Sequence, residues 1–269
     1  MLATRFVVDQ VEPGALAMLR YLVGFLCLVP PLLLTPRIRC LRFAASDLLP
    51  IAGLGIVQFG VLVALLNFAL ATIPAARGAL IFATMPLLTL LLGAALGRER
   101  LGAAKAAGVA LSIAGVALAL GEKAYVRSGE AWIGELAAFG SALCGALCSI
   151  LYRPYLQRYP TLPVSAFAML AAVGALALLA AWEGFFAAPP RVTAAGWAAV
   201  LFIGASSGLG YYLWLKALKG TTPTRVTVFL ALSPITAALL GAAVLGEPLS
   251  SGALLGLGFV ALGLVLALR

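Results

Sequence analysis

The chain has 269 residues, of which 64% are hydrophobic and 10% are charged, and its mean hydropathy is +1.12. A soluble domain is about a quarter charged, so this composition excludes a soluble globular protein and indicates an integral membrane protein. The sequence contains no histidine. This excludes histidine-based catalysis and the HExxH type of intramembrane metalloprotease.

Apolar stretches of about 20 residues, the length that crosses a hydrocarbon core of about 30 Å, follow one another along the whole chain. The fold class predicted from them is an all-α polytopic membrane protein. We predict nine membrane-spanning helices, at residues 15–34, 48–70, 75–96, 103–120, 132–152, 163–182, 195–215, 224–245 and 251–268.

The basic residues alternate between the two sides of the membrane. One set of alternate loops holds twelve Lys and Arg residues and the other set holds five. Cytoplasmic loops carry the excess of positive charge, so we expect a cytoplasmic carboxyl terminus in the plasma membrane, which is the inner membrane of a bacterium. The lipid bilayer explains the net charge of +9, and no nucleic-acid partner is needed.

A proline lies in the middle of the apolar run FATMPLLTLLLGAALGRERL, residues 82–101. Proline inside a helix removes a backbone hydrogen bond at a cost of about 3 kcal/mol, and hydrocarbon offers no water to replace that bond. Sliding the chain by 148 residues aligns 69–120 with 217–268 without a gap and gives 17 identities in 52 pairs. Pro86 then matches Pro234, so the break belongs to an internal repeat.

The two copies have opposite orientation, because an odd number of crossings separates them, and this arrangement is typical of secondary transporters. Upstream, Met1 falls opposite Leu151, so the helix at 132–152 has no counterpart in the first half. We therefore predict five-helix units in which the first helix is missing, giving four helices plus five. Either the chain begins at an internal methionine or it is a true nine-helix variant. The predicted domains are a first repeat, an extracytoplasmic linker and a second repeat, at residues 1–120, 121–131 and 132–269.

With its repeats aligned, the chain resembles the EamA-type transporters of the drug/metabolite transporter superfamily. The resemblance rests on ALAMLRY (15–21), GYYLWLKAL (210–218), SPITAALLGAAVLGEPL (233–249) and GLGFVALGLVLAL (256–268), with their first-half counterparts. It implies a ten-helix fold of two inverted five-helix repeats that moves small metabolites, often outward. The missing first helix departs from that pattern and is expected to leave one wall of the central cavity incomplete.

Transporter sites tend to form near the midplane, where helices are interrupted and polar side chains face a wet cavity. Polar and aromatic residues lie at helical spacing on several of the predicted helices, and both repeats carry a proline at the same depth. Together they suit a small amphiphile such as an amino acid. The candidate substrate-binding residues are Arg20, Gln58, Thr84, Pro86, Ser141, Cys148, Tyr152, Ser207, Tyr211, Trp214 and Pro234.

Each candidate has an alternative role. Arg20 lies about two turns into its helix, where it could bind an anionic group of the cargo or lock helices together through carbonyl oxygens. Serine, threonine and cysteine in membrane helices often bond to their own backbone or to a neighbouring helix. The prolines could be simple kinks.

The carboxylates all fall at loops or helix ends, so we expect no acid at the midplane. Glu99 and its counterpart Glu247 are expected to cap the helix that follows each of them. Cys144 and Cys148 share a helix face but have no histidine or carboxylate beside them, so we expect packing residues, no metal site and no cofactor.

The sequence favours a secondary transporter, more specifically an exporter of small organic solutes, that works by alternating access. A flippase for a lipid-linked group is the related alternative, while a non-transport intramembrane enzyme or scaffold fits less well. Small-residue ridges allow close helix contact within the bundle or in a homodimer. These ridges are Gly252 with Gly256 and Ala104 with Gly108.

Overall fold

The structure is a computed structural model that describes residues 10–34, 43–73, 75–100, 102–120, 131–187, 192–232, 236 and 251–268. Across these residues the chain is helical and contains no strand. Six described helices are long and apolar enough to cross a membrane: Pro13–Leu34, Ala45–Thr72, Arg77–Ala95, Trp132–Arg158, Thr161–Trp182 and Ala194–Gly220. Two shorter apolar helices cover Ala103–Leu118 and Leu254–Ala267. The prediction of an all-α polytopic membrane protein is confirmed, whereas the inverted repeat stays a prediction.

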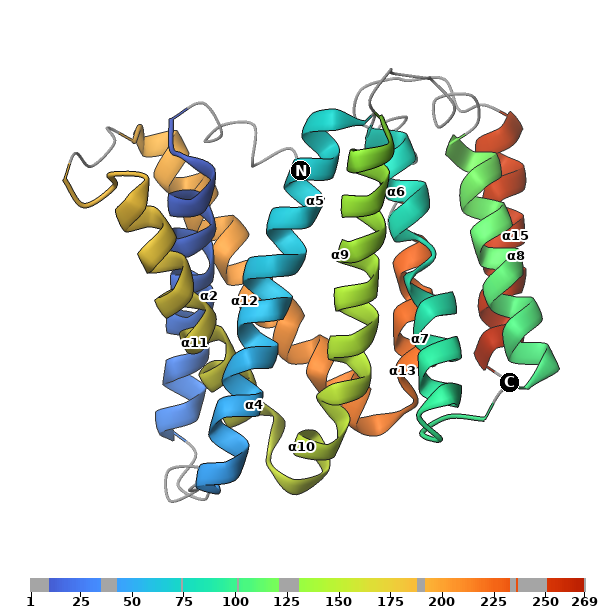
Figure 1. Cartoon of the computed structure of the whole chain (residues 1–269), viewed down its shortest axis with the longest axis horizontal. Coiled ribbons are helices and arrows are strands. Elements are labelled where there is room, and N and C mark those ends of the chain that lie inside the picture. Colours follow the sequence, from blue (N-terminus) through green and yellow to red (C-terminus); the bar gives the residue numbers. More distant parts are fainter. Residues whose placement is uncertain are drawn as a thin grey trace. The chain divides into compact units, whose positions relative to one another are not determined.

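The helices follow the predicted ranges closely (Figure 1). The elements are α2 (Pro13–Leu34), α4 (Ala45–Ile56), the π-helix η1 (Val57–Val61), α5 (Leu62–Thr72), α6 (Ala75–Phe82), α7 (Met85–Ala95), α8 (Ala103–Leu120), α9 (Ala131–Leu151), α10 (Arg153–Arg158), α11 (Thr161–Trp182), α12 (Ala194–Gly220), α13 (Pro223–Thr227), the 3₁₀-helix η3 (Val228–Ala231) and α15 (Ser251–Leu268). Of the helix predicted at 224–245, only its beginning and Thr236 lie within the described residues.

Two departures from regular α-helix divide the long spans. The span predicted at 75–96 is interrupted between α6 and α7, and Pro86 occupies the first turn of α7, where its missing N–H costs no helical bond. The span Ala45–Thr72 contains the π-helix η1, which no feature of the sequence predicted.

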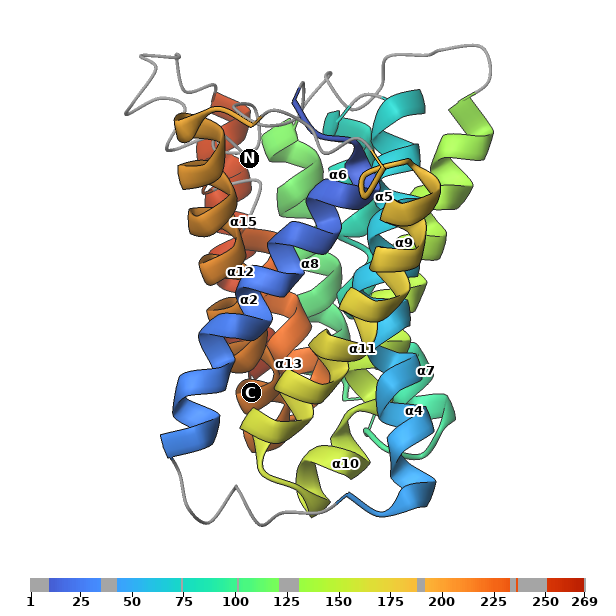
Figure 2. The same ribbon diagram turned by 90° about the vertical axis from the view of Figure 1, so that its left-hand side faces the viewer.

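The chain forms two compact units. Unit 1 contains Met1–Gly60 and Leu151–Gly220, and unit 2 contains Val61–Ile150 and Thr221–Arg269. In unit 1, α2 packs against both α11 and α12, and α11 also packs against α4 (Figure 2). Unit 1 therefore brings together the beginning of the chain and the segment that starts at residue 151.

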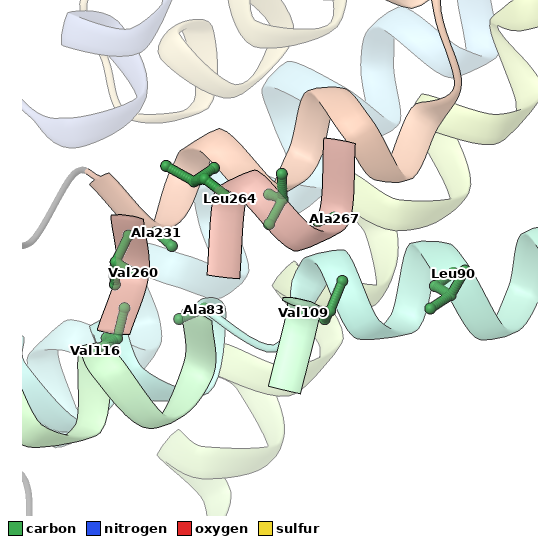
Figure 3. Close-up of a cluster of buried hydrophobic side chains, with 9 residues drawn as sticks. Ala83, Leu90, Val109, Val116, Ala231, Val260, Leu264 and Ala267 are labelled. Atoms are coloured by element: carbon green, nitrogen blue, oxygen red, sulfur yellow. The ribbon is translucent and has the colours of Figure 1, made fainter. Parts of the chain in front are cut away.

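In unit 2, α8 and α15 lie side by side along most of their length. Val109 and Val116 of α8 belong to one buried cluster with Val260 and Leu264 of α15 (Figure 3). Close approach of the two backbones depends on glycine, because a Cβ at Gly115 would lie 2.7 Å from the carbonyl oxygen of Gly256.

Two members of the predicted small-residue ridges, Gly108 and Gly256, therefore pack within the chain. A Cβ at Gly108 would lie 2.6 Å from the carbonyl oxygen of Gly263 in α15. Ala104 is exposed and Gly252 is half-buried. The homodimer stays a prediction.

Candidate functional site

Four aromatic rings form a continuous cluster inside unit 1. The ring of Phe59 in η1 lies 4.5 Å from the ring of Tyr21 in α2 and 4.5 Å from the ring of Tyr211 in α12, measured between centroids. The ring of Tyr152, the first residue beyond α9, lies 6.2 Å from that of Tyr211 in an edge-to-face arrangement. All four side chains are buried, and such contacts stabilise aromatic clusters beyond the burial of area.

Arg20 lies at the edge of this cluster. Its Nε donates a hydrogen bond of 2.7 Å to the hydroxyl of Ser207, and the Ser207 hydroxyl donates to the carbonyl of Ile203 at 2.7 Å. The guanidinium carbon lies 5.2 Å from the centroid of the Tyr21 ring, within the range of a cation–π contact. The arginine is thus fixed between α2 and α12 by a hydroxyl and a ring.

Both roles considered for Arg20 are compatible with this geometry. The Nε bond links two helices, although through a hydroxyl and not through carbonyl oxygens as expected. The two terminal amino groups of the guanidinium have no hydrogen-bond partner among the described residues. A guanidinium edge held in this way can bind a carboxylate through two parallel N–H···O bonds.

The two remaining candidates of unit 1, Gln58 and Trp214, are not members of the aromatic cluster. Gln58 is half-buried next to Phe59, and Trp214 is half-buried one turn after Tyr211 without a ring contact to the described residues. Gln58 was predicted as a candidate from the sequence, but its neighbour Phe59 is the residue that joins the aromatic cluster. Tyr21 was also missed, although it directly follows Arg20.

Five candidates lie in unit 2, four of them within the described residues, and two of those four bond to backbone carbonyls. The Thr84 hydroxyl donates to Ile81 at 2.7 Å, and the buried Ser141 hydroxyl donates to Leu62 at 2.9 Å. These bonds match the alternative considered for hydroxyl residues in membrane helices. Cys148 and Pro86 are buried, and Pro234 lies outside the described residues.

The amino-terminal end of α2, the helix that carries Arg20 and Tyr21, is capped by a side chain from the turn after α11. The carboxylate of Glu183, just after α11, accepts hydrogen bonds from the backbone amides of Gly14 and Ala15 at 3.0 and 2.9 Å. A Cβ at Gly14 would lie only 2.5 Å from that carboxylate. Glu183 therefore satisfies two amides that the first turn of α2 leaves without a helical partner.

Replacing Glu183 by alanine is expected to cost about 1 kcal/mol, the usual effect of losing a helix cap. The direct measurement is hydrogen exchange at the amides of Gly14 and Ala15, which should become faster. Glu12→Ala is the control, because Glu12 is exposed in the same turn. Unchanged exchange in Glu183→Ala would contradict the assigned cap.

Residues 1–121 and 132–269 match the EamA-like transporter family. The chain belongs to this family. A protein of Archaeoglobus fulgidus described as an uncharacterized transporter is 24% identical over 273 residues, which cover 99% of this chain and 92% of that protein. A protein of Streptantibioticus cattleyicolor described as a probable terminal-alkyne amino-acid exporter is 32% identical over 212 residues, covering 77% of this chain and 68% of that protein.

A solved crystal structure has the same fold, with a TM-score of 0.84 and 26% sequence identity. The similarity covers 99% of this EamA-family chain and 90% of the chain in the crystal. The family and its relatives thus identify a multi-pass membrane protein of a transporter family.

Proposed function

We propose that this protein is a secondary transporter that exports amino acids or closely related amphiphiles by alternating access. The proposal is supported by its family and by the relative described as an amino-acid exporter. The observation that carries it is the arginine of α2, whose guanidinium is held by Ser207 and Tyr21 beside a buried cluster of four aromatic rings.

Such a site would offer one group to each part of an amino acid: a cation to its carboxylate and apolar rings to its side chain. The terminal amino groups of Arg20 would bind the cargo carboxylate, and a low-dielectric surrounding strengthens this charge-assisted bond. The rings of Tyr21, Phe59 and Tyr211 would contact the apolar side chain of the cargo. Ser207 and Tyr21 would act by fixing the guanidinium plane.

In this proposal the exporter lies in the plasma membrane with the predicted cytoplasmic carboxyl terminus. Alternating access would open the site to each side in turn.

Arg20→Gln is expected to lower export of carboxylate-bearing cargo about tenfold, the effect of one lost charged hydrogen bond worth about 1.4 kcal/mol. The measurement is efflux from proteoliposomes of leucine, phenylalanine and propargylglycine, each compared with its amide. The wild type should prefer the acids, and Arg20→Gln should transport acid and amide equally.

Lys216→Gln is the matched control, because Lys216 is an exposed cation on α12. It should keep the wild-type preference for acids. If Arg20→Gln keeps that preference as well, Arg20 does not bind the cargo carboxylate. If the wild type transports none of these compounds, the proposed cargo class is wrong.

A further inference from the structure

One membrane-spanning helix passes from unit 1 to unit 2 in the middle of its length. The boundary between the units falls between Gly60 and Val61, inside the 28-residue span Ala45–Thr72. The chain also crosses after Ile150, one residue before the end of α9 and inside the span Trp132–Arg158, and after Gly220, at the end of α12. Among the described residues, only the crossing at Gly60 lies near the middle of a span and within a π-helix.

At this crossing the regular helix gives way to a π-helix. The five residues of η1, Val57–Val61, contain the boundary, with Val57–Gly60 before it and Val61 after it. A π-turn widens the helix by shifting its bonds from i→i+4 to i→i+5, and it is a common cause of sharp helix bending. The span is therefore irregular at the point where its two halves join different units.

The two sides of the π-helix are held by different units. On one side, the ring of Phe59 packs between Tyr21 and Tyr211, which both belong to unit 1. On the other side, the carbonyl of Leu62 accepts a hydrogen bond of 2.9 Å from Ser141 of α9, which belongs to unit 2. Ser141 is completely buried, so it satisfies a carbonyl that lies directly after the π-turn.

We propose that η1 is the hinge of this transporter, at which the span Ala45–Thr72 bends when unit 1 moves relative to unit 2. Phe59 and Leu62 are only three residues apart, so a rotation of either unit must be absorbed by the backbone between them. Glycine at position 60 makes this stretch easier to deform, since it lacks the α-helical preference of other residues.

The hinge would also connect the movement of the two units to the binding of cargo at the aromatic cluster. Cargo that contacts the aromatic cluster would displace Phe59, and Phe59 belongs to the hinge itself. This second step rests on the proposed function, whereas the hinge requires only the two units and the irregular helix between them.

Two glycines of the same span provide a matched test. A Cβ at Gly60 would meet only the Cγ2 of Ile56, at an ordinary contact distance of 3.8 Å, and a Cβ at Gly53 would meet nothing within 4 Å. Alanine therefore fits at both positions and favours regular α-helix at both. Only Gly60 lies in the π-helix.

The measurement is the distance distribution between spin labels on Leu178 of α11 and Leu136 of α9, one in each unit, in liposomes without cargo. Both side chains are exposed, and the four native cysteines are replaced by alanine. We expect two distances in the wild type, and Gly60→Ala should change their ratio about fivefold by favouring the straight helix. Gly53→Ala should leave the ratio unchanged.

Ser141→Ala is the second variant, because it removes the bond that holds Leu62 to unit 2 and leaves the span itself intact. It should also shift the ratio. A distribution that changes in neither Gly60→Ala nor Ser141→Ala, or that changes equally in Gly53→Ala, would overturn the hinge. Because no cargo is present, a failure of the proposed amino-acid cargo leaves this result unaffected.

Discussion

Replacing Glu99 by alanine is expected to destabilise the protein by about 4 kcal/mol, the usual cost of breaking a buried ion pair from one side. The Glu99 side chain is 1% exposed. Its carboxylate accepts from the ammonium of Lys105 at 2.8 Å, from the hydroxyl of Thr224 at 2.8 Å and from the Thr224 amide at 3.4 Å. Lys105 is itself only 15% exposed, so removing Glu99 leaves a buried charge without compensation.

The effect should depend on the charge left behind, and a double-mutant cycle tests this. Glu99→Ala combined with Lys105→Met should recover most of the loss, because it removes both charges. The measurement is the free energy of unfolding in mixed micelles as denaturing detergent is added. Arg158→Ala is the control for an exposed pair: Arg158 is 65% exposed and lies 3.3 Å from Asp47, so its loss should cost less than about 1 kcal/mol.

A loss of less than about 1 kcal/mol in Glu99→Ala, equal to that of Arg158→Ala, would contradict a buried pair. A double variant as unstable as the single one would show that the loss comes from the bonds to Thr224 and not from the charge on Lys105.

The helices could be predicted from the sequence because the bilayer fixes their length. A run of about 20 apolar residues has few alternatives in hydrocarbon, where every backbone group must be bonded within the segment. The break at Pro86 was also predictable, since proline removes a specific hydrogen bond. The π-helix at Val57–Val61 was not, because its residues VQFGV include only one glycine and no proline.

Candidate site residues could be selected from the sequence where a polar group lies on an otherwise apolar helix. Arg20 and Ser207 were identified in this way, and the structure places them in direct contact. Tyr21 and Phe59 were missed because an aromatic side chain in a membrane helix has the same pattern whether it faces lipid, protein or cargo. Only the tertiary packing distinguishes these environments.

One polar prediction had the wrong partner. Glu99 was expected to cap the helix that follows it, which is α8. Its carboxylate instead accepts from the amide of Thr224 at the start of α13, and it contacts α8 only through the Lys105 side chain. The local sequence suggested α8 as the helix capped by Glu99, because α8 is the nearest one. In the structure the chain turns at Gly97, which has a positive φ of 64°. After this turn Glu99 lies beside α13, a helix more than 100 residues away in the sequence.

Replacing Gly208 by alanine is expected to destabilise unit 1 by about 3 kcal/mol, although alanine normally favours a helix. A Cβ at Gly208 would lie 2.8 Å from the Cα of Gly24, and a Cβ at Gly24 would lie 3.1 Å from the amide nitrogen of Gly208. The backbones of α2 and α12 are thus in contact. No side chain can move aside, so the two helices must separate.

Separation of the helices would also affect the proposed site. Gly204, Ser207, Gly208 and Tyr211 recur at the spacing of one face of α12, and Ser207 on this face holds Arg20 of α2 at 2.7 Å. Gly208→Ala should therefore lower transport as well as stability, in contrast to a substitution that only weakens the fold elsewhere.

Gly210→Ala is the matched control, because a Cβ at Gly210, two residues away on the same helix, would meet nothing within 4 Å. It should stabilise the protein by up to about 1 kcal/mol through its helix preference alone. The two variants differ from the wild type by the same single methyl group, and unfolding in mixed micelles should show changes of opposite sign. Equal changes in both would mean that α2 and α12 are not in backbone contact at Gly208.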